Sequence, residues 1–268
     1  MRAAPVLEVL CHRVVWALAF LLVLSWRQGQ LGAVRSGLRS RRALAILAAS
    51  TTLLAVNWLV YIWAVVNGRL LEGSLGYYIN PLVSVLLGVV ILGERLERPV
   101  QIAVGIAAAG VLWLALQLGE FPWIPMVLAT SFGLYGLMRK LAPVGALAGL
   151  TIETALLLPL TGGYLAWAIA SGRAAFLAGD RSLDGLLLLA GPVTAVPLLC
   201  FAAAARRLPL TTLGFLQYLS PSIQFALAVF VYGEPLTTPR LLAFSCIWAG
   251  LAIFLAHSMR GAPPMETS

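Results

Sequence analysis

Charged side chains are scarce in this sequence. Asp, Glu, Lys and Arg make up 10% of the 268 residues, against roughly 25% in soluble domains. Hydrophobic residues make up 61%, and the mean hydropathy is +0.95. This much apolar surface is more than one soluble core can hide, so we expect the chain to lie in a lipid bilayer.

The chain also has few residues of the kinds that carry enzymatic or metal chemistry. Cys11, Cys200 and Cys246 lie in or beside different apolar runs and form no Cys-x-x-Cys pair, so they give no disulfide or metal framework. His12 and His257 lie in different runs, and the sequence has no His-Glu-x-x-His or Gly-x-Ser-x-Gly motif. An intramembrane enzyme would need a nucleophile with a base, or a metal cluster. We therefore predict that the protein is not an enzyme and has no cofactor or metal site.

Long apolar runs fill the chain. Reading between charges gives nine candidate spans, most of them close to the twenty or so residues that cross a hydrocarbon core. The runs are continuous rather than alternating, which excludes a closed β-barrel. The sequence therefore predicts an all-α, polytopic membrane bundle with no soluble domain. The spans lie at about 9–26, 43–66, 72–92, 100–117, 123–138, 147–170, 183–205, 210–232 and 240–257.

Basic residues fall unevenly on alternate connections. The net charge is +8, but the arginines sit in short segments between apolar runs, so membrane topology explains them and no nucleic-acid partner is expected. The connections that share a side with the segment from Arg27 to Arg42 hold 12 basic residues, and those on the other side hold 5. This asymmetry predicts a cytoplasmic C-terminus. A removable signal peptide is not expected, because the first run lacks a small-residue cleavage site.

The stretch from Leu75 to Glu94 returns later in the chain. Identical residues recur at a constant offset of 140, and Leu75-Gly76 recurs as Leu213-Gly214 at an offset of 138. Matches at a fixed offset indicate a duplicated unit. We place the first EamA-sized repeat at 1–119, the second at 120–260 and a cytoplasmic tail at 261–268. The pairs at 140 are Tyr78 and Tyr218, Pro81 and Pro221, Gly93-Glu94 and Gly233-Glu234, Pro99 and Pro239, and Gly110 and Gly250.

The second repeat has one span more than the first. Its five spans begin with 123–138, and the position 140 residues earlier lies before Met1, so this chain supplies four spans plus five. An odd number of crossings inverts the second copy. Inverted repeats are typical of secondary transporters, which bind substrate near mid-membrane at the repeat interface. We expect full-length relatives to have five spans plus five; a start codon placed too late and a genuine truncation both explain the difference.

Proline interrupts both copies of the repeated stretch near mid-membrane depth. Pro81 and Pro221 each remove a helical hydrogen bond and free a carbonyl group, which survives in lipid only against protein or a water-filled cavity. We therefore predict a substrate-binding and translocation site formed by broken helices of both repeats, with alternating access. A packing kink is the alternative, because Pro and Gly are common in membrane helices. The polar side chains beside the prolines are Tyr77, Tyr78, Asn80, Gln217, Tyr218 and Ser220.

Other polar residues also lie inside predicted spans. Glu153 is the one carboxylate well inside a span, which makes it a candidate for substrate binding or proton coupling. Arg13 stands 140 residues earlier, beside His12. Both are candidates for coupling or gating, and the alternative for Arg13 is a side chain that snorkels to the headgroups. Asn57 and Trp58 lie near mid-depth of the second span and are candidates for lining the path; the alternative for Asn57 is a hydrogen bond between helices.

Two further glutamates, Glu94 and Glu234, end equivalent helices on opposite sides of the membrane, beside arginines. Groups in such places are gates or caps at an interface more often than substrate ligands. We therefore class both as candidates for gating.

These motifs resemble the RarD-type branch of the EamA, or drug/metabolite transporter, superfamily, and the resemblance covers essentially the whole chain. It implies ten membrane helices in two inverted EamA units in a bacterial inner membrane. It also implies a permease or exporter of small organic solutes or drugs, in a family named for chloramphenicol sensitivity. The resemblance rests on His12-Arg13, Asn57-Trp58, Ile62 to Val65, Leu75 to Glu94, Tyr135-Gly136, Arg139-Lys140, Ile152 to Thr154, Val196 to Phe201, and Leu213 to Glu234.

The sequence departs from the family's pattern in lacking the first helix. If that truncation is genuine, a non-transporting or regulatory membrane protein is the alternative function. The expected partners are the lipid bilayer, a small-molecule solute and, as coupling ion, protons. Homo-oligomerisation, the identity of the substrate and the direction of transport are left open.

Overall fold

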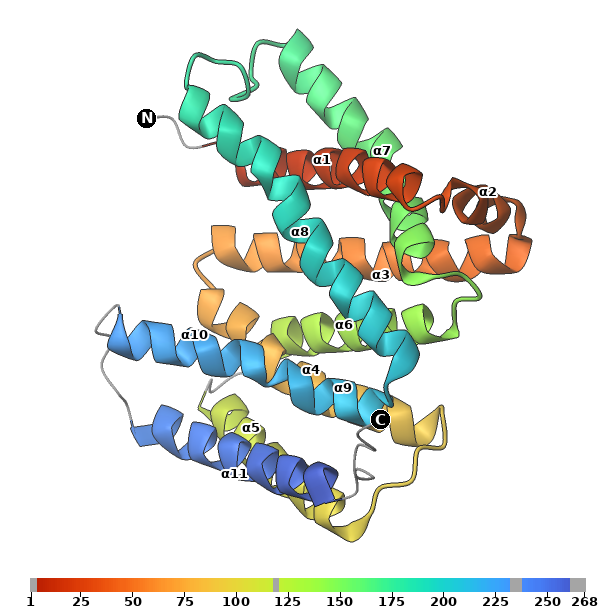
Figure 1. The fold of residues 1–268 in the computed structure, drawn as a ribbon. Coiled ribbons are helices and arrows are strands. Elements are labelled where there is room, and N and C mark those ends of the chain that lie inside the picture. The colour runs from red at the N-terminus through yellow and green to blue at the C-terminus, as the bar shows by residue number, and fades with distance from the viewer. Residues whose placement is uncertain (1–3, 118–120, 232–237, 261–268) are drawn as a thin grey trace, which may run out of the picture. The chain divides into compact units, whose positions relative to one another are not determined.

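The computed structural model describes residues 4–117, 121–231 and 238–260, and within these ranges the regular elements are α-helices. Their order along the chain is shown in Figure 1. The helices are α1 (Val6–Arg27), α2 (Leu31–Arg39), α3 (Arg41–Val66), α4 (Leu70–Val90), α5 (Arg98–Leu116), α6 (Trp123–Leu141), α7 (Ala146–Ala170), α8 (Arg181–Arg207), α9 (Leu210–Gln217), α10 (Leu219–Phe230) and α11 (Thr238–Arg260).

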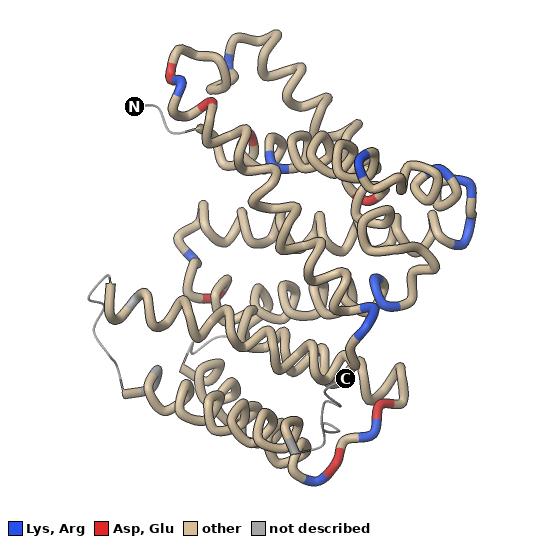
Figure 2. Tube along the Cα trace, viewed as in Figure 1, with Lys and Arg blue, Asp and Glu red and all other residues tan. Residues whose placement is uncertain are grey.

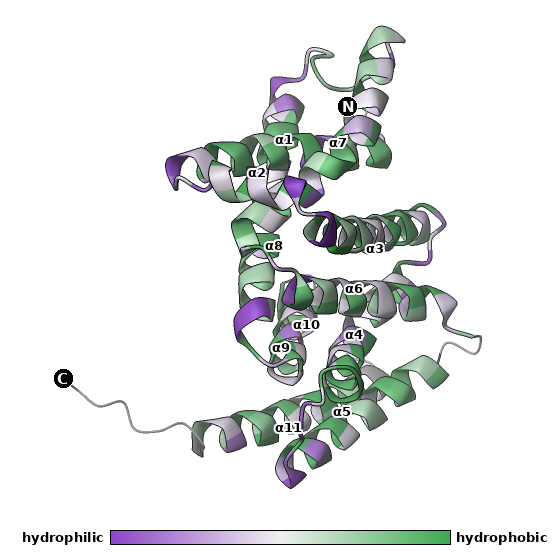
Figure 3. Cartoon of the chain, turned by 90° about the vertical axis from the view of Figure 1, so that its right-hand side faces the viewer, coloured by the Kyte–Doolittle hydropathy of each residue, from purple (hydrophilic) through white to green (hydrophobic). Residues whose placement is uncertain are grey.

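Most of these helices are long and apolar enough to cross a bilayer. In the described part of the chain, 7 helices meet that test by length and composition, namely α1, α3, α4, α5, α7, α8 and, over Leu241–Met259, α11. Hydrophobic residues run along most of each helix, and hydrophilic ones gather toward helix ends and connections (Figure 3). The predicted polytopic helical membrane bundle is confirmed. Of the two other predicted spans, one is α6 and the other is divided into α9 and α10.

The connection from Arg27 to Arg42 contains a helix that the sequence analysis did not predict. This helix, α2, packs against α7, where Gly37 fits between Ile152 and Val144. Its nine residues are too few and too polar to span a bilayer. It is therefore a short helix between two spans.

The helix boundaries carry the same register as the sequence repeat. α7 begins 140 residues after α1, α8 140 after α3, α9 140 after α4, and α11 140 after α5. The pair α5 and α11 is reciprocal at the level of single contacts. A Cβ on Gly110 would lie 2.8 Å from the carbonyl oxygen of Ala243, and a Cβ on Gly250 would lie 2.6 Å from that of Ala103. Each glycine therefore lets the partner helix approach its backbone at the equivalent place.

The chain forms two compact units, each built from residues of both sequence halves. Unit 1 comprises Met1–Ile62 and Leu134–Leu208, and unit 2 comprises Trp63–Gly133 and Pro209–Ser268. The boundaries between the units fall inside α3 and α6. The assignment of repeats to 1–119 and 120–260 rests on the sequence register and stays a prediction.

In unit 1, α1 packs along both α7 and α8. Gly191 permits the close crossing of α8, because a Cβ there would overlap the backbone of α1 at Trp16. At the other end of α8, basic side chains close the carbonyl ends of two helices. Lys140 Nζ at the end of α6 donates to the carbonyl oxygen of Leu208 at 2.6 Å, and Arg206 in α8 donates to that of Ala142 at 2.6 Å. Each helix thus supplies a cation to the C-terminus of the other, where the helix dipole favours positive charge.

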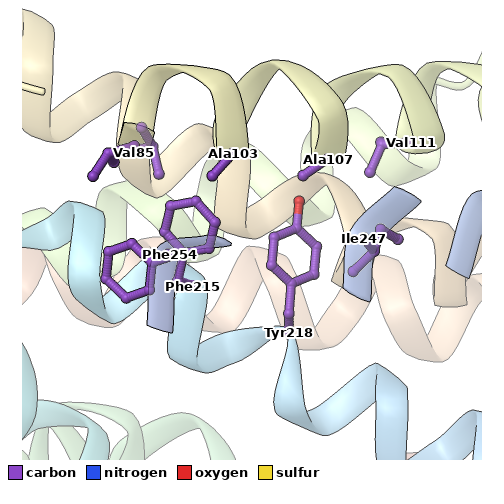
Figure 4. Close-up of a cluster of buried hydrophobic side chains, with 9 residues drawn as sticks. Val85, Ala103, Ala107, Val111, Phe215, Tyr218, Ile247 and Phe254 are labelled. Carbon is purple, nitrogen blue, oxygen red and sulfur yellow. The ribbon is translucent and has the colours of Figure 1, made fainter. Parts of the chain in front are cut away.

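Unit 2 is organised around an apolar cluster between α4, α5, α9 and α11. The rings of Phe215 and Phe254 stack with their centroids 4.1 Å apart. Figure 4 shows the Tyr218 ring beside them, with its hydroxyl directed toward Ala103 and Ala107 of α5. The small side chains of α5 leave the space that these rings fill. The buried members of the cluster are Val85, Val100, Ala103, Ala107, Val111, Phe215, Tyr218, Ile247 and Phe254.

The two proline-containing helices differ, which corrects the expectation of a break in both repeats. α4 runs from Leu70 to Val90 as one helix with Pro81 inside it. The equivalent segment is interrupted at Tyr218, where α9 ends and α10 begins, three residues before Pro221. A proline removes one backbone donor and crowds the preceding turn, and a helix either bends around this defect or breaks there. In this structure only the second copy breaks.

Candidate functional site

The most buried charged group of unit 1 is Glu153 on α7, whose side chain is 1% exposed. Its Oε1 accepts a hydrogen bond from the Ser50 hydroxyl on α3 and lies 3.4 Å from Nη1 of Arg139 on α6. The Tyr135 side chain of α6 also interacts with this carboxylate. Three helices therefore converge on one carboxylate, as a charge in the interior of a protein requires.

Arg139 reaches Glu153 because α7 leaves room for it. The guanidinium is fully buried, donates from Nη2 to the carbonyl oxygen of Ala146 at 3.1 Å, and lies over Gly149. A methyl group at Gly149 would overlap the guanidinium. The sequence analysis placed Arg139 among the cytoplasmic loop charges and missed this role. The signal was available, because a glycine lies one helical turn before Glu153 in a hairpin with Arg139.

A small cavity lies beside this ion pair, inside unit 1. Its lining includes the side chains of Arg13, Trp58 and Glu153. Glu153 Oε2 has no hydrogen-bond partner among the described residues. The space left for the centre of a water molecule is about 10 Å³, which is room for a single water. An organic solute can enter only if the surrounding helices move apart.

The cavity is lined by residues at equivalent positions of the two repeats. Many of its lining residues form pairs separated by the repeat offset of 140, one member on α1 or α3 and the other on α7 or α8. The cavity therefore lies where the two copies face each other within unit 1, as expected for the binding site of an inverted-repeat transporter. The pairs are Arg13 and Glu153, Val14 and Thr154, Ala17 and Leu157, Leu54 and Thr194, and Trp58 and Leu198.

Arg13 faces this cavity. Its Nε donates to the Thr194 hydroxyl on α8 at 2.9 Å, and its guanidinium lies 5.6 Å from the centroid of the Trp58 ring. A guanidinium over an indole face gains a cation–π interaction. Trp58 is therefore a wall of the cavity and a contact of Arg13. Asn57, one residue earlier, is half-buried and is not among the described residues that line the cavity.

His12 and Glu8 take part in a different contact of α1. His12 is buried, and its Nδ1 accepts a hydrogen bond from Trp16 Nε1 at 3.1 Å. Glu8, which the sequence analysis did not single out, accepts from the backbone N–H groups of Ala175 at 2.8 Å and Phe176 at 3.1 Å. The His12 ring packs on Phe176 with centroids 4.7 Å apart. Together they hold the connection after α7 against α1, away from the cavity lining.

In unit 2 the polar residues beside the prolines form a neutral network. Asn80 Nδ2 donates to Gln217 Oε1, and Gln217 Nε2 donates to the Ser84 hydroxyl at 3.4 Å. Asn80 Oδ1 and the Tyr218 hydroxyl are buried with no hydrogen-bond partner among the described residues. A water molecule or a polar group of a solute would satisfy both.

The remaining candidates of this region lie around that network or away from it. Tyr78 packs edge-on against Phe244 at 5.4 Å, and Pro81 and Pro221 are buried. Tyr77 is 42% exposed, and Ser220 is exposed and accepts from Gln224 at 3.4 Å. The structure therefore brings Asn80 and Gln217 into contact and turns Tyr77 and Ser220 outward from unit 2.

Glu94 is a helix cap. Its carboxylate accepts hydrogen bonds from the backbone N–H groups of Leu210 at 2.6 Å and Thr211 at 2.9 Å, and from the Thr211 hydroxyl at 2.7 Å. It thereby supplies acceptors to the first turn of α9, whose own N-cap, Pro209, makes no side-chain hydrogen bond. Glu234, the equivalent candidate, lies outside the described residues. Among the described residues no group of three or more His, Cys, Asp or Glu side chains is placed to hold a metal ion.

Comparison with known proteins gives consistent matches over the length of the chain. Residues 1–116 match the EamA-like transporter family. An uncharacterised transporter of Pseudomonas aeruginosa is 48% identical over 262 residues, which cover 96% of this chain and 86% of that protein. Protein RarD of Escherichia coli is 45% identical over 256 residues, covering 95% and 86%.

Two more distant matches add a name and a fold. The chloramphenicol-sensitive protein RarD of Pseudomonas aeruginosa is 36% identical over 253 residues, covering 93% of this chain and 83% of that protein. One solved crystal structure superposes with a TM-score of 0.69 at 20% identity, covering 96% of this chain and 90% of that chain. This structure supports the fold alone.

Proposed function

The chain belongs to the RarD-type branch of the EamA-like transporter family, and we propose that it is a secondary transporter of small organic solutes in the bacterial inner membrane. Membership makes it a membrane transporter. The solute class, alternating access and proton coupling are our proposal. The alternative of a non-transporting membrane protein has no specific observation in its favour.

The observation that carries the proposal is the cavity of unit 1 and its lining by repeat-equivalent residues. Glu153 directs an oxygen without a described partner toward a space that also contacts the Arg13 side chain and the Trp58 ring. An ionisable group inside a membrane protein is costly and is usually retained for function. We propose that Glu153 takes up protons and that the aromatic and aliphatic walls contact the solute. Because the cavity holds about one water, this conformation corresponds to a closed state.

Residues of unit 2 complete the proposed translocation path. Asn80, Gln217 and Tyr218 stay candidates for polar contacts with the solute, supported by the unpartnered Asn80 Oδ1 and Tyr218 hydroxyl. Pro81 and Pro221 stay candidates for helix bending during transport, supported by the interruption at Tyr218.

The basic side chains support a cytoplasmic C-terminus. In Figure 2 the basic residues of unit 1 gather mainly where α2, α3, α6 and α8 have their basic ends. An excess of Lys and Arg on one side of the spans is typical of the cytoplasmic side. We propose this orientation for the protein in the cell.

Flux into proteoliposomes tests the proposal. The purified protein is reconstituted, a pH gradient is imposed, and uptake of labelled chloramphenicol and a panel of aromatic and aliphatic amphiphiles is measured against protein-free vesicles. We expect flux of at least one solute. We expect that flux to fall to background in Glu153→Gln and to decrease in Trp58→Ala.

Matched controls separate the site from general damage. Glu97→Gln changes a carboxylate that is 74% exposed, and Trp167→Ala changes a tryptophan that is 51% exposed; both should transport as the wild type does. The transporter proposal is wrong if folded wild-type protein moves no solute of the panel. The assignment of Glu153 is wrong if its Gln variant keeps wild-type flux under the same pH gradient.

A further inference from the structure

The two oxygens of the Glu153 carboxylate have different surroundings. Oε1 takes both the Ser50 hydroxyl and Arg139 Nη1, whereas Oε2 has no partner among the described residues, and Glu153 borders the cavity. We propose that Arg139 is a positioning residue for this carboxyl: its guanidinium keeps Glu153 ionised, leaves Oε2 free for the cavity, and so sets the pH at which the group takes up a proton. The inference rests on the proposed role of Glu153 in proton coupling.

Few other ionisable groups face this carboxyl. From α6 come Arg139 and Tyr135, and from α1 comes Arg13 across the cavity. α3 and α8 contribute only hydroxyl groups to the contacts and the lining, from Ser50, Thr51 and Thr194. Arg139 is the cation that makes an ion pair with Glu153. It is therefore the group whose removal changes the charge balance at the carboxyl most.

The direction of the effect follows from the energetics of buried charge. An ionised carboxylate away from water is unfavourable unless a cation and hydrogen bonds compensate it. An arginine stays charged in proteins, so the ion pair can exchange a proton only at the carboxyl. The proton would come from solvent by way of the cavity and bind Oε2, leaving a neutral acid beside the cationic Arg139. Without the guanidinium the neutral acid is favoured, and it should persist to higher pH.

The neighbouring residue Lys140 provides a matched contrast. Its Nζ donates to the carbonyl oxygens of Leu208 at 2.6 Å and Ala205 at 3.4 Å, and it has no described contact with Glu153. Both residues end the same helix and carry the same charge. If basic residues at the end of α6 served topology or helix capping alone, neutralising either would leave the protonation of Glu153 unchanged.

Gly149 allows the guanidinium to be moved without being removed. A methyl group there would overlap the end of the Arg139 side chain, which is flexible and can shift away. Gly149→Ala should therefore weaken the ion pair in a protein that still carries every charge. Gly163→Ala, in the same helix with open space around it, is the control.

Infrared difference spectroscopy of the purified protein during a pH titration tests the inference without a solute. The signal is the carbonyl band of a protonated carboxyl that is absent in Glu153→Gln. We expect its midpoint to move to higher pH by about one to three units in Arg139→Gln, and in the same direction by less in Gly149→Ala. Lys140→Gln and Gly163→Ala should titrate as the wild type does, and Arg139→Lys should restore most of the wild-type midpoint.

The possible outcomes are distinct. Unchanged midpoints in Arg139→Gln and Gly149→Ala overturn the inference, and so does the absence of any band that depends on Glu153. If Arg139→Gln does not fold, Gly149→Ala decides alone. The proposed transport can fail by the flux test while the midpoints shift as expected, so the two failures are distinguishable.

Discussion

The interiors of the two units differ in kind. Unit 1 buries full charges within its helices, with Glu153 and Arg139 in contact and Glu8 beside His12. Unit 2 buries a neutral amide pair and an aromatic cluster, and its described buried carboxylate Glu72 sits in the first turn of α4. A charge in the middle of an apolar bundle is costly unless it has a use, whereas rings and small residues pack at no such cost. The difference assigns ion chemistry to unit 1 and helix packing and bending to unit 2.

This difference arises although both units draw on the same duplicated segments. Equivalent positions hold Arg13 in one copy and Glu153 in the other, and both line the cavity of unit 1. In unit 2 the equivalent positions hold two tyrosines, Tyr78 and Tyr218, which pack in or against one apolar cluster. Inverted repeats fix where the copies meet. The side chains at the meeting point then decide whether the place binds ions or packs.

The largest effect should come from breaking the charge pair of unit 1. Arg139→Gln or Glu153→Gln alone leaves one buried charge without its partner, which should lower the free energy of unfolding by about 3–5 kcal/mol. The double variant removes both charges and should cost less than the sum of the two. Thermal unfolding of the three variants in detergent measures this. Additive losses would show that the pair contributes nothing as a pair and would weaken the contrast with unit 2.

Hydropathy predicted most of the fold because lipid imposes it. The predicted spans 43–66 and 72–92 correspond to α3 (Arg41–Val66) and α4 (Leu70–Val90), since the length of a span is set by the bilayer. The same rule could not find α2, which is shorter than any span. It also could not tell that Pro221 interrupts its segment while Pro81 does not, because this depends on packing around each helix rather than on the proline.

The candidate site was predicted in part. Intramembrane cost identified Glu153, and depth identified Trp58, and both line the cavity. Arg139 was missed because counting charges by membrane side treats every basic residue at a span end as solvent-exposed, whereas its guanidinium turns back into the bundle over Gly149. Glu8 was missed because it lies near the start of the chain, where its contacts with the connection after α7 have no sequence signature.

A medium effect should come from the glycine seam of unit 2. Ala at Gly110 or Gly250 would place a methyl group 2.8 or 2.6 Å from a backbone carbonyl oxygen of the partner helix. We expect each substitution to lower the free energy of unfolding by about 1–3 kcal/mol, and by similar amounts, because the contacts are reciprocal. Gly105→Ala, in the same helix α5 with open space around it, should be neutral or slightly stabilising. Unequal losses at Gly110 and Gly250 would show that the seam is not symmetric in energy.

The smallest effects should come from the neutral polar groups of unit 2, and here stability and transport are expected to separate. Asn80→Ala removes the hydrogen bond to Gln217, and such bonds between membrane helices contribute about 0.6–2 kcal/mol. Tyr218→Phe removes a buried hydroxyl that has no partner among the described residues, so thermal unfolding should change little or rise slightly. If Tyr218→Phe keeps full stability but loses flux, the hydroxyl contacts the solute and unit 2 takes part in binding. If it keeps both, Tyr218 packs the apolar cluster, and binding belongs to the charged interior of unit 1.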